Sequence, residues 1–515
     1  MVSGCRVARV QPGPIVSLED VSHSRHQVVL RFAVDGLSFT TSLWYREVDL
    51  DALAREYGPE ALRRILFHIA VFELNKVCSL RPESVELGPF ADLWTPALEA
   101  LWREVFVKIW AQWRYENDDP TYEGPRFCGG EATGAEPLRV RRAPAAETLA
   151  FCGGGKDSLA SMRLLERAGV DYDVLVYASS IYGPAAPQHR LIDALVQRCR
   201  PKEALRQWVY DDFLDSPVLD LHPELGVKPK TLTAAETPSS VFAALPYVLS
   251  RGYTSFSLGH ERSADQGQLV WARTGEDVNH QWGKSAAAER LLSAYIREHL
   301  VADFTYFSPL KPIHDLVIFS MLRQSQADVP FTHSCNLRKP WCLECPKCLY
   351  VWLGMAAFLP RTCIRATFGA DDLLAREALV PGFRALLGLD GRQPFECIGG
   401  AEEVRVLLGL CERHGYRGPT IDLFCAEVGR SAALRLAEGY LDVDLTNTAI
   451  PASMRARVGP ELASAAASAR VFIRDTLTLG ESPRAGLDEG SGSRGGRPRA
   501  GALNPGILQI IGPGE

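Results

Sequence analysis

Strands and helices alternate along the middle of the chain, and this rhythm constrains the fold more than any other feature. Alternation of this kind predicts parallel strand pairing, with helices covering both faces of the sheet. We therefore predict an α/β protein whose doubly wound parallel sheet lies within residues 146–370. The strand-like runs are TLAF (148–151), DYDVLVYAS (171–179) and YTSFSLGHE (253–261). The helical patterns are DSLASMRLLERAG (157–169), QHRLIDALVQRC (188–199) and ETPSSVFAALPYVLSRG (236–252).

The flanking segments have other patterns. Residues 1–145 combine strand-like alternation, a hairpin signal at Asp35-Gly36 and helical periodicity, which together predict a small N-terminal α+β domain. The end of this segment, from about residue 118, is rich in Gly and Pro and is typical of a linker. Residues 371–470 are mostly helical in pattern. Residues 471–515 are dominated by Gly, Ser, Pro and Arg, and we expect a disordered tail there.

Charge and composition exclude several classes of function. The net charge is −6, whereas proteins that act on nucleic acid usually carry a basic surface, so we expect no nucleic-acid partner. The sequence has no run of about 18 apolar residues and no secretory signal, so we expect no membrane partner and a cytoplasmic location. In that compartment the 13 cysteines favour reduced thiols and metal ligands over disulfides.

The segment FCGGGKDSLA (151–160) lies between the first of these strands and its helix. Glycines allow backbone N–H groups to approach an anion closely, and a helix N-terminus adds partial positive charge. Lys156 adds a full charge and Ser158 a hydroxyl. The loop is not a Walker A loop, because Asp157 follows Lys156 and Ala150 stands where the opening glycine is required. The alternative is a tight turn without a ligand, which three glycines followed by Lys-Asp-Ser disfavour.

A cluster of cysteines lies in SCNLRKPWCLECPKCLYVW (334–352). Their spacing, C-x6-C-x2-C-x2-C, suits tetrahedral coordination of zinc by four thiolates, and such closed sites are structural. A redox pair and simple burial are the alternatives. The predicted zinc ligands are Cys335, Cys342, Cys345 and Cys348.

Polar residues are dense in the segment 257–289, which follows the last of these strands. In doubly wound folds ligands bind at the carboxyl ends of the strands, so this segment is a second candidate for function. For any single residue a solvated loop is an equal alternative. The residues that stand out are His260, Glu261, Arg262, Asn279, His280, Gln281, Trp282 and Lys284.

GGGKDS resembles the SGGxDS loop of the ATP pyrophosphatase (PP-loop) superfamily, whose members grip the pyrophosphate of ATP and leave an adenylated substrate. The resemblance implies that the residues after the strand hold pyrophosphate and metal. The first Ser of the pattern is Gly153 here, which removes one hydroxyl. It also implies that the end of the second strand, Val176, Tyr177 and Ala178, faces the adenine. The implied ATP-binding residues of the loop are Gly153, Gly154, Gly155, Lys156, Asp157 and Ser158.

Several motifs together narrow the resemblance to one family. The chain resembles the UDP-N-acetyl-α-muramoyl-L-alanyl-L-glutamate epimerases (MurL family) over roughly residues 149–400. This implies inversion of the terminal L-glutamate of a UDP-muramoyl dipeptide to D-glutamate, with ATP and Mg²⁺ consumed to AMP and pyrophosphate. The motifs, in order, are GGGKDSL, ERSA, EDVNHQWGK, SCN…WC..CPKC and PFECIGG (394–400).

Roles for the remaining residues follow from their chemistry together with this resemblance. Asp157 and Glu261 are candidates for Mg²⁺, which prefers carboxylate oxygens. The acid/base work has three candidates, His280, Lys284 and Cys152, between which the sequence does not choose. The candidate substrate-binding residues are Arg262, Arg273, Asn279 and Trp282.

Four rivals remain open at the level of the sequence. One is another PP-loop adenylating enzyme, such as the nitrile synthase of deazaguanine biosynthesis, which is much shorter. A tRNA thiolase is disfavoured by the acidic charge. A third is an epimerase of the same mechanism acting on a secondary-metabolite peptide. The last is a non-catalytic ATP-binding scaffold, against which the intact Lys-Asp-Ser argues.

Overall fold

A ten-stranded sheet forms the centre of the protein, seen in a computed structural model that describes residues 13–129, 134–221, 235–369, 372–429 and 432–478. The strand order is β12-β9-β6-β7-β8-β3-β2-β1-β4-β5, and most neighbouring pairs are parallel, which confirms the predicted α/β class. The strands are β1 (Ile15–Ser24), β2 (Gln27–Val34), β3 (Leu37–Tyr45), β4 (Ser84–Glu86), β5 (Arg126–Cys128), β6 (Thr148–Cys152), β7 (Tyr172–Ser179), β8 (Ala204–Asp211), β9 (Ser255–Ser257) and β12 (Thr305–Phe307).

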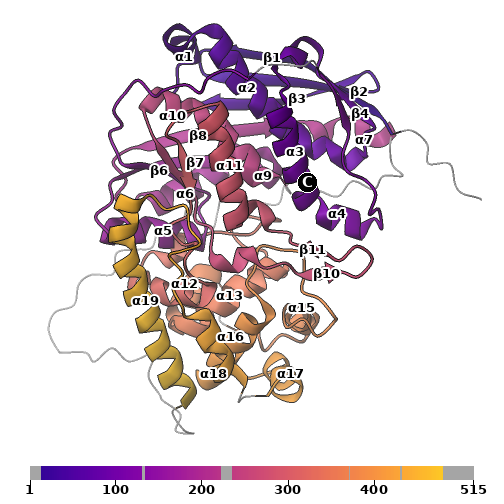
Figure 1. The fold of residues 1–515 in the computed structure, drawn as a ribbon. Helices are drawn as coiled ribbons and strands as arrows, with labels where there is room; N and C mark the ends of the chain where they lie inside the picture. Colours follow the sequence, from indigo (N-terminus) through magenta and orange to yellow (C-terminus); the bar gives the residue numbers. More distant parts are fainter. Residues whose placement is uncertain (1–12, 130–133, 222–234, 370–371, 430–431, 479–515) are drawn as a thin grey trace, which may run out of the picture.

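Helices cover both faces of this sheet, and the N-terminal elements and the C-terminal helices lie at opposite ends of the molecule (Figure 1). The helices of the first half are α1 (Leu50–Tyr57), α2 (Pro59–Glu73), α3 (Pro96–Ile109), α4 (Ala111–Glu116), α5 (Lys156–Arg167), α6 (Ala185–Val196), α7 (Val218–Leu221), α9 (Glu236–Ala243) and α10 (Leu245–Arg251). Those of the second half are α11 (Ala286–His299), α12 (Asp315–Leu322), α13 (Pro346–Phe358), α14 (Arg361–Phe368), α15 (Val380–Leu386), α16 (Ala401–Arg413), α17 (Pro419–Glu427), α18 (Ala432–Ala437) and α19 (Ala452–Thr478).

The central strands are buried on both faces, as parallel sheets require. Leu149 and Leu175 belong to a core shared with α1, α2, α3, α9, α10 and α11. Their neighbours Ala150 and Val176 point the other way, into a core shared with α5, α6, α12, α13, α16 and α19. Both faces of these strands are therefore covered by apolar side chains.

The segment before residue 146 does not form a sheet of its own. β3 pairs antiparallel with β8, with Leu43 opposite Val209, so the N-terminal strands extend the central sheet without a break. The predicted hairpin at Asp35-Gly36 is confirmed, because both residues have positive φ and join β2 to β3. The stretch expected to be a linker contains β5, which pairs with β4.

The C-terminal part differs from expectation at its boundary. α19 continues to Thr478, so residues 471–478 are helical and not part of a disordered tail. This helix buries Ile473 against the second core, which the composition of the tail alone does not reveal. Residues 479–515, for which we also expected disorder, lie outside the described residues.

Candidate active site

The three glycines after β6 serve different structural purposes. Gly154 has a φ of 85°, and a Cβ there would lie 2.0 Å from the His333 ring. Gly155 caps α5, and its Cβ would lie 2.8 Å from Ser334 Oγ. Gly153 is exposed, and a Cβ there would meet nothing within 4 Å. The segment 333–334 therefore packs directly on the loop, whereas Gly153 leaves open space.

Lys156 begins α5 and is almost completely buried. Its Nζ lies 2.7 Å from Asp157 Oδ1 and 2.6 Å from Asp315 Oδ1. Asp315 Oδ2 also accepts a hydrogen bond from Tyr350 Oη at 2.8 Å. Burial raises the pKa of Asp157 to about 6, although the neighbouring Lys156 opposes this change. The loop thus carries a carboxyl group that holds its proton more tightly than an ordinary aspartate.

A cavity of about 220 Å³ opens in front of this loop and contacts residues from distant parts of the chain. Gly153, Gly155 and Lys156 form one side of it. The cavity lies beyond the carboxyl ends of β6 and β7, where ligands bind in open α/β sheets. Other residues that line it are Asp157, Ser158, Tyr177, Tyr182, Glu236, His260, Glu261, Lys284, His333, Asn336, Lys339, Lys347 and Cys397.

Lys284 and Cys397 form a close pair at this cavity. Lys284 Nζ donates to Cys397 Sγ at 2.8 Å. Burial raises the pKa of Cys397, but Lys284, Lys347 and a hydrogen bond to His280 outweigh burial and lower it to about 6. Sequence reasoning missed Cys397 as a functional residue. The signal was present, because the motif PFECIGG contains it.

Lys311 joins the two loops that carry Glu261 and Lys284. Its buried Nζ donates to the backbone oxygens of both residues at 2.8 Å and lies 3.2 Å from Asp265 Oδ1. Burial raises the pKa of Glu261, but Lys156, Lys284 and Lys311 outweigh burial and lower it. Glu261 is thus held as a carboxylate. The sequence gives no sign of this role, because it depends on two carbonyl groups that are distant from Lys311 in the chain.

Two predicted acid/base residues differ in their placement. His280 Nδ1 donates to Gln112 Oε1 at 2.6 Å, and the same ring contacts Cys397, so His280 lies beside the Lys284–Cys397 pair. Cys152 does not line the cavity and is completely buried in the core. Burial raises its pKa to about 11, so it does not supply a thiolate at neutral pH.

The predicted substrate-binding residues are not brought to the cavity wall. Arg273 lies between β10 (Leu269–Trp271) and β11 (Glu276–Val278), exposed and paired with Asp118 at 2.7 Å. Asn279 is buried and bonds to Ala264 O and to the Gln281 backbone, which fixes the loop. Arg262 and Trp282 also lie outside the lining of the described cavity. At the end of β7, Tyr177 faces the cavity, whereas Val176 and Ala178 are buried.

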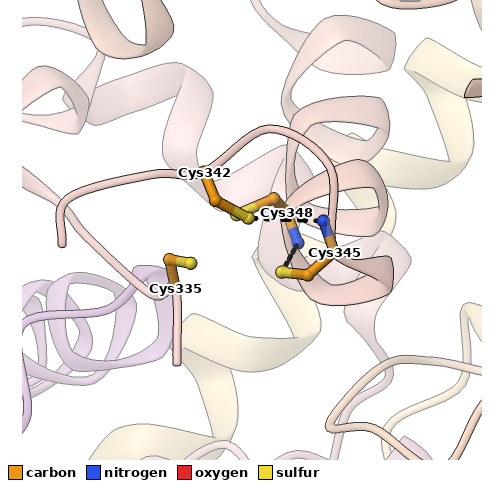
Figure 2. A group of neighbouring side chains, drawn as sticks. All are labelled: Cys335, Cys342, Cys345 and Cys348. Atoms are coloured by element: carbon orange, nitrogen blue, oxygen red, sulfur yellow. Dashed lines mark hydrogen bonds between the residues drawn. The ribbon is translucent and has the colours of Figure 1, made fainter. Parts of the chain in front are cut away.

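The four cysteines converge as the spacing predicts, with Cys335 facing the other three across a short gap (Figure 2). Their sulfur atoms all lie within 4.8 Å of one another, and Cys342 Sγ is 3.7 Å from Cys348 Sγ. Zn–S bonds of about 2.3 Å in a tetrahedron require sulfur atoms about 3.8 Å apart. Backbone N–H groups also point at Sγ of Cys335, Cys342 and Cys345. The donor set and spacing therefore fit zinc.

A second cavity, of about 470 Å³, adjoins the first. Tyr177 and Glu236 line both of them. Its wall combines Trp208 and Tyr210 from β8 with the acidic side chains of Glu73 and Asp211. The combined volume of the two cavities is much larger than the triphosphate group of a nucleotide requires. Within the described ranges, no helix has the length and apolar character needed to cross a bilayer.

Fold and site together define an α/β protein with a glycine-loop site at the carboxyl edge of a mostly parallel sheet, supported by a four-cysteine cluster. Two family models match this chain. The MurL N-terminal domain matches residues 233–309, and the MurL C-terminal domain matches residues 329–428. The chain belongs to the MurL family of UDP-N-acetyl-alpha-D-muramoyl-L-alanyl-L-glutamate epimerases.

Three curated relatives carry that epimerase name. The protein of Micromonospora sp. is 34% identical over 327 residues, which covers 61% of this chain and 67% of the relative. The protein of Salinispora tropica is 34% identical over 333 residues (62% and 68%). That of Xanthomonas oryzae pv. oryzae is 30% identical over 324 residues (60% and 66%).

Proposed function

We propose that this protein inverts the terminal L-glutamate of UDP-N-acetylmuramoyl-L-alanyl-L-glutamate to D-glutamate during peptidoglycan precursor synthesis. The reaction consumes ATP and proceeds through an acyl-adenylate, with AMP and pyrophosphate released. The observation that carries the proposal is the meeting of the glycine loop, Glu261 and the Lys284–Cys397 pair in one cavity. The names of the relatives support the same substrate. A cytoplasmic location is part of this proposal.

ATP is needed for activation and not as a driving force, because inversion of one stereocentre is nearly thermoneutral. A free carboxylate makes its α-proton very hard to remove, since the carbanion would stand beside a negative charge. Adenylation removes that charge and makes the carbonyl an electron sink. After removal of the α-proton and reprotonation from the other face, hydrolysis releases the inverted acid.

The loop residues and Lys156 would hold the pyrophosphate part of ATP. Lys156 is already neutralised by Asp157 and Asp315, so an incoming phosphate competes with two carboxylates for it. Asp157 and Glu261 both line the cavity and would hold Mg²⁺, which neutralises phosphate charge. Such a cation also relieves the repulsion among these carboxylates.

The cysteine cluster would hold a structural zinc ion. A closed site with four thiolates leaves no position for substrate, so its contribution is to folding. His333 and Ser334, which pack on the glycine loop, directly precede Cys335 in the chain. Zinc would thereby fix the segment that covers Gly154 and Gly155.

The adjoining cavity of about 470 Å³ would receive the remainder of the UDP-linked substrate. This places the glutamate near Lys284 and Cys397, and the larger part of the molecule beyond Tyr177. We propose no substrate contact for four residues that lie outside the cavity wall, Arg262, Arg273, Asn279 and Trp282.

The test is incubation of the purified protein with the UDP-muramoyl dipeptide, ATP and Mg²⁺, followed by chiral analysis of glutamate and an assay for AMP. We expect D-glutamate in the peptide and AMP in parallel. AMP formation with a different acid, but not with this dipeptide, would contradict the substrate and retain the adenylation chemistry. Absence of AMP with all acids tried would contradict both.

A further inference from the structure

Cys397 lies where the chemistry of the proposed reaction takes place. It follows α15 in the segment that leads to α16, and its sulfur faces the same cavity as the glycine loop. Lys284 precedes Cys397 by 113 residues in the sequence, and its Nζ donates to the sulfur at 2.8 Å. His280 contacts the same sulfur. His280 and Lys284, two of the acid/base candidates from the sequence, thus both contact Cys397.

The charges around Cys397 favour its thiolate. Lys284 and Lys347 are the cations that act on it, His280 forms a hydrogen bond with it, and Tyr182, bonded to Glu236 at 2.5 Å, lies close enough to feel its charge. Lys284, Lys347 and His280 together lower the pKa of Cys397 to about 6 despite burial. Cys152 shows the contrast, because without a cation its pKa is raised to about 11.

Lys284 itself is unsuited to accept a proton. Burial lowers its pKa, but Cys397 and Glu261 outweigh burial and raise it well above the ordinary value, so the side chain stays an ammonium at neutral pH. The 2.8 Å between Nζ and Sγ also leaves no room for a substrate carbon between them. Lys284 and Cys397 therefore act from the same side of any bound glutamate.

We propose that the Cys397 thiolate is the base that removes the α-proton of the activated glutamate, with Lys284 as the positioning residue that holds the thiolate. This inference rests on the proposed function and names the base of that same site. General bases work best when their affinity for protons is matched to the pH at which they operate. A thiolate held by a lysine meets this requirement without a metal.

The protons and electrons balance as follows. The thiolate takes the α-proton, the C–H bond breaks, an S–H bond forms, and the electron pair moves into the activated carbonyl to give an enolate. Water in the cavity protonates the enolate on its opposite face, which restores a C–H bond with inverted configuration. The hydroxide that remains takes the thiol proton, so the thiolate returns and no net proton is consumed. The α-hydrogen of the product therefore comes from solvent.

The first experiment measures the thiolate without substrate. Iodoacetamide alkylation of Cys397 in the full-length protein is followed by peptide mass spectrometry between pH 4.5 and 9. We expect the rate to reach half its maximum near pH 6. In Lys284→Met the midpoint should move toward that of an ordinary thiol, about 8.5. A wild-type midpoint near 8.5 would overturn the proposal, even if the protein is an epimerase.

The second experiment separates proton removal from adenylation. In D₂O, Cys397→Ser is incubated with the dipeptide, ATP and Mg²⁺, and both AMP and α-deuterium are measured. We expect incorporation of deuterium to fall by about 10²–10⁴-fold, the usual contribution of a general base, with AMP still formed. The matched control is Cys425→Ser, a half-buried cysteine on α17, which should behave like the wild type.

Two outcomes contradict the role of Cys397 without contradicting the epimerase function. Deuterium incorporation at the wild-type rate by a folded Cys397→Ser variant would show that another group is the base. A dipeptide covalently bound to Cys397, detected by intact mass, would show a nucleophile in place of a base. Failure of the wild type to form AMP and D-glutamate, in contrast, contradicts the proposed function itself.

Discussion

The backbone N–H of His333 donates to the carbonyl of Gly154 at 2.9 Å, and the His333 ring fills the space where a side chain at position 154 would begin. The glycine loop is therefore closed from outside by the segment that leads into the cysteine cluster. Gly153, one residue earlier, has no such cover. Two neighbouring glycines thus differ in what a methyl group would do.

Gly154→Ala is expected to destabilise the protein by about 2 kcal/mol or more, because the left-handed backbone disfavours Ala and its Cβ collides with the imidazole. ATP binding should weaken with it. Gly153→Ala is the matched control and should leave the unfolding free energy nearly unchanged. Chemical denaturation of both variants measures the difference. Equal losses would contradict the distinction between the two positions.

Zinc removal should affect the glycine loop as well as folding. We expect the purified protein to contain zinc, and Cys348→Ser to lose it because one of the four thiolates is missing. The variant should also be much less stable, since structural zinc contributes on the order of 10 kcal/mol to folding. Because residues 333–334 lie between Cys335 and the loop, partial removal by a chelator should weaken ATP binding before global unfolding. Elemental analysis, thermal melting and nucleotide titration measure this. Cys425→Ser, outside the cluster, is expected to keep its zinc.

Buried histidines should make the protein sensitive to acid. His68 is held between Arg64 O and Tyr295 Oη at 2.8 Å each, and burial lowers its pKa to about 4. An unfolded histidine titrates near 6.5, so the stability that neutral His68 contributes is complete above that pH. It is lost as pH falls from 6.5 through 4, on the order of 3 kcal/mol.

The test compares the pH dependence of unfolding in two variants. His68→Gln should show a flatter decline in unfolding free energy between pH 6.5 and 4 than the wild type. His23→Gln changes a surface residue on β1 and should keep the wild-type slope. If both variants keep that slope, the acid sensitivity does not arise from His68.

Arg273 provides a test of a residue that sequence reasoning placed in the site. It is exposed and forms an ion pair with Asp118 on the surface. Such pairs contribute about 0–1 kcal/mol. Arg273→Ala should therefore keep kcat and KM close to those of the wild type in the epimerase assay. A large increase in KM would show that the hairpin closes over the substrate.

The sequence predicts the local parts of this site well and the non-local parts poorly. The strand, loop and helix around residues 148–167 and the cysteine cluster depend on short-range spacing, which the sequence displays directly. The β3–β8 pairing joins segments about 165 residues apart and is set by the packing of two cores. The same holds for Cys397, whose altered acidity depends on a lysine that is distant in sequence. Arg273 had a suitable side chain but a surface position.

Lys311 is expected to be essential for the geometry of the site although it does not touch the substrate. Its buried ammonium joins the backbones of Glu261 and Lys284 and pairs with Asp265. Lys311→Met removes a buried donor shared by two carbonyl groups and the Asp265 carboxylate, which should cost about 3–5 kcal/mol. The control, Lys202→Met, removes a surface lysine paired with Asp171 and should cost less than about 1 kcal/mol. Because the loops separate when Lys311 is lost, Cys397 alkylation at pH 7 should also slow in any folded fraction. Rapid alkylation in Lys311→Met would show that Lys284 holds the thiolate without this support.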